Sequence, residues 1–373
     1  MEDFDIKIER SKPCILEEIV DILKKFLEYC LWCLSCGCYH RPADPKSYNG
    51  NGYEMILLDS EKKAVQNLLC YMEQEASGDP VLTEEHIRAM CILTYSDNEE
   101  LQRSAALCFT EVSERMTSAL TIPIARPLVE LLRSRDVQVQ RAATLAVSNF
   151  CMIGPGTNKD VLVTCGVIPP LVQLLHSKNV EVQCNTCGCI TSLATTDTNK
   201  QLIVNSHCIR PLVNLMKSAD IRVQRNAAGA VLNLTHLQSN RNELVTKGAI
   251  PVLIDILHST DTDVQYYTAA SLSNLAVNEK HRAMMTAVGH FDVIKQLVKL
   301  LLTKKDRVKC QACYALRNLA SDDENQLLIV QFGALPHLHS IIKSKSTHKD
   351  TLGAAVACLR NLSIHKRNEV SIN

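Results

Sequence analysis

Four cysteines near the N-terminus are spaced closely enough to support a specific chemistry. They are Cys30, Cys33, Cys36 and Cys38. Apolar residues recur at helical spacing just before them, from Ile15 to Phe26, and cysteines beside an amphipathic helix are candidates for S-acylation. Residues 1–29 carry five Lys or Arg against eight Asp or Glu, so lipid rather than basic charge would have to supply the membrane affinity. Because one acyl chain binds a bilayer only marginally, several adjacent cysteines favour durable anchoring by palmitate.

The same cysteines have three alternative roles: a zinc or iron–sulfur site, an apolar cap on the first repeat, and redox chemistry. Their spacing would permit metal binding, but no second pair of ligands lies nearby. N-terminal myristoylation is disfavoured because residue two is Glu2. The apolar stretch 29–39 covers about half of the length that a membrane-spanning helix requires. We therefore expect residues 1–59 to be a membrane-anchoring segment followed by a linker.

The other reactive side chains form no catalytic or metal-binding pattern. Twelve histidines are scattered, and no Ser, His and acid set surrounds a recognisable nucleophile turn. His337 and His339 are two residues apart on an expected helix and point to different sides. Cys184, Cys187 and Cys189 lie within another expected helix, where packing is favoured over metal binding. Phosphate-binding glycine loops are absent, so we expect no enzyme, no cofactor and no metal.

A recurring asparagine is the candidate binding feature. It stands at the same position of successive repeats, as Asn149, Asn233, Asn274, Asn318 and Asn361. A primary amide offers both donors and an acceptor, so a row of amides can pair with the backbone of an extended peptide without contacting its side chains. The alternative is that these amides bond only to the preceding repeat. Ser192 replaces Asn in one repeat and weakens that position.

Basic residues accompany these asparagines. Arg317 and Arg360 immediately precede two of them, and Arg225 and Lys309 lie near the start of the same helices. A groove with basic side chains would prefer an acidic or mixed peptide. The alternative is that each of these side chains is merely solvated. The aromatic residue that nuclear-import adaptors place four residues before each Asn is Trp, and the only Trp here is Trp32, which disfavours import-signal binding.

A repeat of about 41 residues, beginning near Thr83, sets these positions. One column of the repeat is Gln102, Gln140, Gln183, Gln224, Gln265 and Lys309, and the asparagine position follows it by nine residues. Gly166, Gly248 and Gly333 each precede a proline by three residues, which is typical of one helix ending and the next beginning. Each repeat therefore predicts a short helix, a second helix and a longer third helix, which is the armadillo arrangement.

Composition is consistent with this prediction. The chain has 373 residues, 40 Lys+Arg against 40 Asp+Glu, and 46% hydrophobic residues, which excludes disorder and disfavours nucleic acid as a partner. Seventeen cysteines without a secretory signal indicate a reduced compartment. Most of them, including Cys108, Cys151, Cys313 and Cys358, occupy apolar helical positions. We predict an all-α fold: an armadillo-repeat right-handed α-superhelix (solenoid) over 60–373, with about seven repeats, behind an N-terminal helical and cysteine-rich tail.

Several motifs resemble one family of armadillo proteins. They lie at 95–98, 101–107, 182–185, 263–267, 307–312 and 317–322. From about Ser60 onward the chain resembles the vacuolar protein 8 family of fungal vacuole scaffolds. The resemblance implies organelle adaptors and autophagy factors as partners in the groove, membrane attachment through acylated cysteines, and roles in vacuole inheritance, organelle contact, vacuole fusion and autophagy-related targeting.

The expected location is then the cytoplasmic face of the vacuolar or lysosomal membrane, with the cytoplasm as the location of unacylated protein. Family members continue with further repeats, whereas Asn368 opens a short helix that this chain does not complete. We expect a shortened chain or self-association at that end. The alternative function is that of a soluble β-catenin-like armadillo protein in cell adhesion or signalling.

Overall fold

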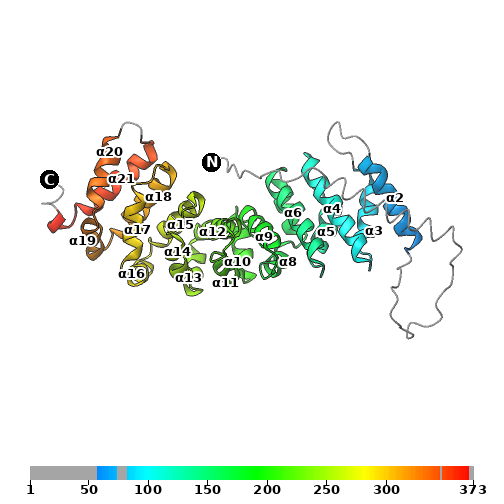
Figure 1. Ribbon diagram of the computed structural model, residues 1–373, viewed down its shortest axis with the longest axis horizontal. Helices are drawn as coiled ribbons and strands as arrows, with labels where there is room; N and C mark the ends of the chain where they lie inside the picture. The colour runs from blue at the N-terminus through cyan, green and yellow to red at the C-terminus, as the bar shows by residue number, and fades with distance from the viewer. Residues whose placement is uncertain (1–56, 74–81, 345–346, 369–373) are drawn as a thin grey trace. The chain divides into compact units, whose positions relative to one another are not determined.

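The chain is helical throughout the part that the structure describes. The computed structural model describes residues 57–73, 82–344 and 347–368, and within these ranges it contains helices and no strands. Two compact units divide the chain, Met1–Pro170 and Leu171–Asn373 (Figure 1). None of the helices in the described ranges is both long and apolar enough to cross a bilayer. The predicted all-α fold is confirmed.

The first unit consists of helices packed through small and apolar side chains. Its helices are α2 (Asp59–Glu73), α3 (Glu84–Thr94), α4 (Glu99–Arg115), α5 (Ile122–Leu131), α6 (Val137–Met152) and α7 (Thr157–Thr164), and α8 (Ile168–Leu174) crosses the boundary to the second unit. The long helices α4 and α6 pack against each other. Phe109 of α4 and Phe150 of α6 are fully buried, so both helices supply the core of this unit.

The second unit repeats a pattern of three helices. The short first helices are α10 (Asp197–Asn205), α13 (Gln238–Thr246), α16 (Glu279–Ala287) and α19 (Asp323–Gln331). The second helices are α11 (Ile209–Leu215), α14 (Ala249–Ile256), α17 (Asp292–Leu300) and α20 (Ala334–Lys343). The long third helices are α9 (Val180–Leu193), α12 (Ile221–Thr235), α15 (Thr262–Leu275), α18 (Asp306–Leu319) and α21 (Lys349–Leu362).

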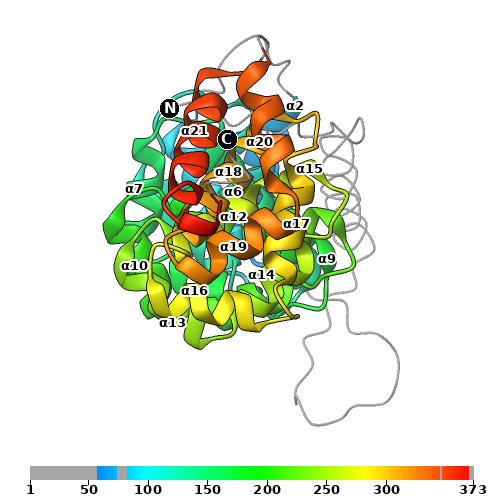
Figure 2. The same cartoon turned by 90° about the vertical axis from the view of Figure 1, so that its left-hand side faces the viewer.

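Each third helix of the second unit packs against the next one in the chain. The packed pairs are α9 with α12, α12 with α15, α15 with α18, and α18 with α21. Figure 2 shows the short helices α10, α13 and α16 gathered along one edge of this unit, away from the third helices α12, α18 and α21. The predicted three-helix repeat is therefore confirmed.

The glutamine column has a structural role at the turn before several third helices. Gln140 donates from Nε2 to the carbonyl oxygen of Ser134 at 2.8 Å, and Gln265 donates to that of Ser259 at 2.7 Å. Each bond spans six residues and closes the turn on the helix that follows it. The side chains of Asn98, Asp136, Asn179, Asp220 and Asp261 cap the same helix starts. Repeat spacing is thus fixed by local turn geometry.

The predicted glycine turns are also confirmed. Gly166, Gly248 and Gly333 adopt left-handed φ angles of 80°, 83° and 84°, which glycine adopts without steric cost. The turn before α17 differs, because Gly289 precedes Leu297 by eight residues whereas Gly248 precedes Leu253 by five, so this repeat has three extra residues. There Gly289, His290 and Phe291 all have positive φ, so the added length forms a left-handed turn of its own before α17.

Buried thiols behave as predicted for a reduced core. Cys108, Cys151, Cys313 and Cys358 are all buried. Burial raises the pKa of Cys108, Cys151 and Cys358 to about 12, so these sulfurs stay protonated and unreactive at neutral pH.

A second column of amides, whose role the sequence did not reveal, closes the turn after several third helices, and His281 takes this position after α15. Asn199 donates to the carbonyl oxygen of Leu193 at 3.2 Å, and Asn325 donates to that of Leu319 at 3.1 Å. In the first unit Asn158 is fully buried, donates to Phe150 O at 3.2 Å, and accepts from the backbone N–H of Leu120 at 2.8 Å. This amide therefore joins the loop before α5 to the last turn of α6.

The Asn158 amide gives a stability prediction. Asn158→Ala should lower the free energy of unfolding by about 2–3 kcal/mol, because it leaves a buried N–H and a buried C=O without partners. Urea denaturation followed by circular dichroism measures the change. The control is Gln138→Ala, which truncates an exposed amide of the same unit and should shift the midpoint little. An equal shift in both variants would contradict the assigned role.

Candidate peptide-binding surface

The recurring asparagines of the second unit point in one common direction. Each donates from Nδ2 to the last turn of the preceding third helix. The acceptors are Thr191 O for Asn233 at 2.9 Å, Thr235 Oγ1 for Asn274 at 2.9 Å, Ser273 O for Asn318 at 2.9 Å, and Arg317 O for Asn361 at 3.0 Å. We call Asn233, Asn274, Asn318 and Asn361 the asparagine row. Its members are half-buried.

The sequence left open that these amides bond only to the preceding repeat. In the structure each amide does bond to the preceding repeat. That bond uses one of the two N–H donors. Within the described residues, the Oδ1 atoms of Asn233, Asn274 and Asn361 have no hydrogen bond. One donor and one acceptor on each of these amides are therefore available to a ligand. Structural and binding roles are compatible in one side chain.

Asn149 differs from the row. It lies on α6 in the first unit, where it is only 3% exposed and donates to Ser113 Oγ at 3.1 Å. Little of this amide is left for a ligand. Glu111 occupies the corresponding position of α4 and is held by an ion pair with Arg115. The first unit therefore offers a weaker version of the predicted surface.

Arg317 is positioned by aromatic and amide contacts. Its guanidinium lies 5.1 Å from the centre of the Tyr314 ring, and its Nη2 and Nε donate to Asn318 Oδ1 at 2.9 and 3.1 Å. Arg360 is exposed, and neither it nor Lys309 has a side-chain hydrogen bond or ion pair within the described ranges. These three cations lie on α18 and α21 and carry positive charge with no acidic partner.

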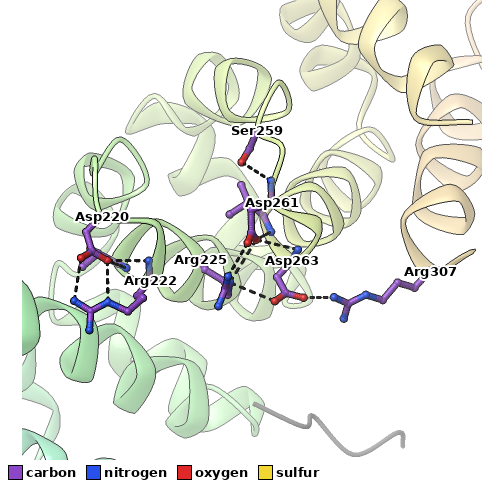
Figure 3. A network of polar contacts seen from close by, with 9 residues as sticks. Asp220, Arg222, Arg225, Ser259, Asp261, Asp263 and Arg307 are labelled. Carbon is purple, nitrogen blue, oxygen red and sulfur yellow. Dashed lines mark hydrogen bonds and ion pairs between the residues drawn. The ribbon is translucent and has the colours of Figure 1, made fainter. Parts of the chain in front are cut away.

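Arg225, by contrast, is neutralised within the protein. Its Nη2 donates to Asp261 Oδ2 at 2.6 Å, and its Nε lies 3.3 Å from Asp263 Oδ2 (Figure 3). Arg225 is therefore not the free basic side chain that the sequence predicted at the start of α12, because the next repeat supplies two carboxylates that pair with it. Arg103 makes the same kind of contact with Asp136 in the first unit, also at 2.6 Å.

The capping carboxylates are strong acids in this setting. Burial tends to raise the pKa of Asp261, but the hydrogen bond from Arg225 and those from the backbone N–H groups of Val264 and Asp263 outweigh it, and the pKa is lowered. The hydrogen bond from Arg222 is the main cause of the lowered pKa of Asp220. Both groups remain ionised at neutral pH and hold the helix starts.

The sequence missed a column of alternating charge beside the asparagine row. Eleven residues before each asparagine position stand Glu181, Arg222, Asp263, Arg307 and Asp350. Arg222 pairs with Glu181 at 3.0 Å, and Arg307 pairs with Asp263. The sequence contains this column as a charge that alternates between negative and positive from one repeat to the next at the same helix position.

Other predicted sites have a simpler outcome. Cys30, Cys33, Cys36 and Cys38 lie outside the described residues. Within the described ranges, no group of three or more His, Cys, Asp or Glu side chains could hold a metal ion.

Repeats of the Armadillo/beta-catenin-like family model match residues 124–152, 157–195, 196–236, 238–277, 286–321 and 322–364. These matches cover more than half of the chain. This chain belongs to the armadillo family. Its matched repeats end close to the ends of α6, α12, α15, α18 and α21, so each armadillo unit closes with a third helix.

Relatives within the armadillo family indicate a narrower group. Vacuolar protein 8 of Schizosaccharomyces pombe is 53% identical over 86% of this chain and 57% of its own length. Vacuolar protein 8 of Candida albicans is 53% identical over 87% of this chain and 54% of its own length. The resemblance to the vacuolar protein 8 family is thus confirmed, and the chain spans little more than half the length of these relatives.

A solved structure of computationally designed armadillo repeat proteins for modular peptide recognition is also similar. It is 25% identical to this chain, with a TM-score of 0.58, over 64% of this chain and 99% of its own length. The same arrangement of third helices therefore occurs in proteins made to bind peptides.

The lowered pKa of Asp261 predicts acid sensitivity. Its pKa lies below the ordinary value of 3.8, so the carboxylate stabilises the fold above about pH 4, and this stabilisation is lost as pH falls through the lower folded pKa. Asp261→Asn keeps a good N-cap but removes the charge. Its thermal midpoint should therefore fall less between pH 7 and pH 3 than that of the wild type.

Asp255→Asn is the matched control for this pH experiment. Asp255 is exposed on α14, and its carboxylate makes no hydrogen bond or ion pair within the described residues. This variant should keep the pH dependence of the wild type. If Asp261→Asn also keeps it, the Arg225–Asp261 contact does not contribute to stability as argued.

Proposed function

We propose that this chain is a non-enzymatic armadillo scaffold that binds extended segments of partner proteins along its third helices and attaches to the vacuolar or lysosomal membrane by palmitoylated cysteines. The observation that carries the proposal is the asparagine row, four amides of common orientation on successive third helices. It occurs in a chain that is 53% identical to vacuolar protein 8 over most of its length.

Binding would use the amides in the same way at each repeat. An extended peptide carries alternating N–H and C=O groups, and Asn233, Asn274 and Asn361 can each offer one acceptor and one donor to them, whereas Asn318 already accepts from Arg317. Individual bonds of this kind contribute little, but contacts along a single ligand add up once its first part is bound. A peptide held mainly through its backbone leaves room for partners of different sequence. The designed armadillo repeat proteins for modular peptide recognition, which are similar in fold, support this proposal.

Charge would select among these partners. Arg317, Arg360 and Lys309 present cations without acidic partners, so an acidic or mixed segment gains charge-assisted hydrogen bonds that a neutral one lacks. We propose Asn149, Asn233, Asn274, Arg317, Asn318, Arg360 and Asn361 as the binding residues, with Asn149 contributing least because it is buried. Organelle adaptors and autophagy factors are the proposed partner class, in vacuole inheritance, organelle contact, vacuole fusion and autophagy-related targeting.

Removing two cations tests the peptide-binding role. Arg317→Ala/Arg360→Ala should weaken binding of a fluorescein-labelled peptide of alternating Glu and Gly by tenfold or more at low salt, because two charge-assisted contacts are lost. Fluorescence anisotropy measures the affinity. The control is Arg210→Ala/Lys280→Ala, which removes the same charge from exposed positions on α11 and α16. Equal loss in both double variants would show only a general charge effect.

The cysteine cluster gives an independent prediction about membrane attachment. Changing Cys30, Cys33, Cys36 and Cys38 to Ser should move the protein from the membrane fraction to the supernatant and remove labelling by an alkyne analogue of palmitate, because no acyl acceptor is left. Cys70→Ser is the control, since Cys70 is an exposed cysteine outside the cluster. Membrane association that persists without the cluster would overturn acylation as the anchor, whereas wild-type protein found only in the supernatant would favour the soluble β-catenin-like alternative.

A further inference from the structure

Asp263 lies between two arginines that come from different repeats. Arg225 of the preceding third helix places Nε 3.3 Å from Asp263 Oδ2, and Arg307 of the following third helix pairs with Asp263 Oδ1 (Figure 3). The guanidinium of Arg307 also lies 5.1 Å from the centre of the Tyr266 ring. A single carboxylate thus pairs with two guanidinium groups, and the three residues belong to three successive repeats.

These groups lie beside the proposed binding surface. Asp263 and Arg307 each stand eleven residues, or about three helical turns, before a member of the asparagine row. They therefore share a helix face with Asn274 and Asn318. Their side chains are accessible: Asp263 is 33% exposed, Arg225 is 35% exposed and Arg307 is 50% exposed. The cluster lies about 16 Å along the third helices from the row, so it meets a segment that extends from the row toward the helix starts.

The carboxylates of Asp263 and Asp261 differ in the groups that bind them. Asp261 accepts hydrogen bonds from the backbone N–H groups of Asp263 and Val264 at 3.0 and 2.9 Å, so it caps α15 and is fixed there. The contacts of the Asp263 carboxylate, within the described residues, are with the two guanidiniums alone. Partly exposed ion pairs of this kind have a small net strength. Asp263 can therefore turn away without uncapping a helix.

We propose that Asp263 is a built-in competitor for acidic ligands. In the unliganded surface its carboxylate occupies Arg225 and Arg307. An acidic side chain of a partner pairs with Arg307 only by displacing it, whereas Arg225 keeps its hydrogen bond to Asp261 in either case. The inference depends on the proposed function and adds a specificity-determining residue to it: acidic segments bind first at Arg317 and Arg360 and extend toward α15 only by exchanging with Asp263.

The test is binding of an acidic peptide to a variant without the competitor. The probe is a fluorescein-labelled peptide of alternating Glu and Gly, about twelve residues long, which spans roughly 40 Å when extended. Asp263→Asn keeps the shape of the side chain and removes its charge. It should bind the probe about three- to tenfold more tightly than the wild type in 50 mM NaCl, and the difference should shrink in 300 mM NaCl.

Two further proteins isolate the competing carboxylate. Asp255→Asn removes one negative charge from the same unit away from the cluster, and it should change affinity less than twofold. Asp263→Asn/Arg307→Gln removes a freed arginine together with the competitor, and it should lose most of the gain. Circular dichroism melts of all proteins verify that the changes in affinity do not arise from unfolding.

The outcomes separate this inference from the proposed function. If Asp263→Asn binds no more tightly than the wild type while Arg317→Ala/Arg360→Ala still binds more weakly, the surface binds acidic segments but Asp263 does not compete, and the inference is wrong. If Asp255→Asn gains as much as Asp263→Asn, the effect is general electrostatics, which also overturns it. If no folded protein binds the probe, the proposed acidic ligand fails and the inference fails with it.

Discussion

The packing of each third helix on the preceding one is the interaction on which the second unit depends. A single repeat cannot bury its own apolar face, so its neighbours must cover it. Val231 and Leu272 are almost completely buried on successive third helices. The asparagine row lies on the same interface, and each amide joins its helix to the last turn of the previous one. Stability and the proposed binding surface are therefore built from the same contacts.

This double use limits how the surface can vary. An amide at a row position can be replaced only by a side chain that still satisfies the preceding repeat, because a half-buried carbonyl without a donor is costly. Ser192, at the same position of α9, is shorter than asparagine. Charge can vary more freely, since Arg360 is exposed and makes no contact that the fold requires. Ligand selectivity is thus expected to evolve through the charges that flank the row.

Sequence reasoning worked where the cause lies within one repeat. The glutamine spacing and the glycine turns follow from bonds that span six residues or from a single φ angle, so periodicity alone revealed them. It worked less well where partners are one repeat apart. Arg225 was expected to be a free cation, but its acidic partner Asp261 is 36 residues away and meets it only after the helices stack. Which side chains form such ion pairs depends on how one repeat is rotated relative to the next.

The start of α18 shows how charge becomes concentrated. Where α4, α6, α9, α12 and α15 have an aspartate or asparagine cap and α21 has His348, α18 has Lys305, which makes no side-chain cap bond. At the position from which Arg225 contacts the next cap, the repeat before α18 has Tyr266 instead. An arginine there would face a lysine, whereas the tyrosine ring accepts Arg307 at 5.1 Å. Because the acidic cap is replaced by Lys305 and the arginine that would contact it is replaced by Tyr266, no two like charges face each other at these two positions. This replacement leaves Lys305 and Arg307 at the start of the helix that carries Lys309 and Arg317, and of these four cations Arg307 is paired with Asp263.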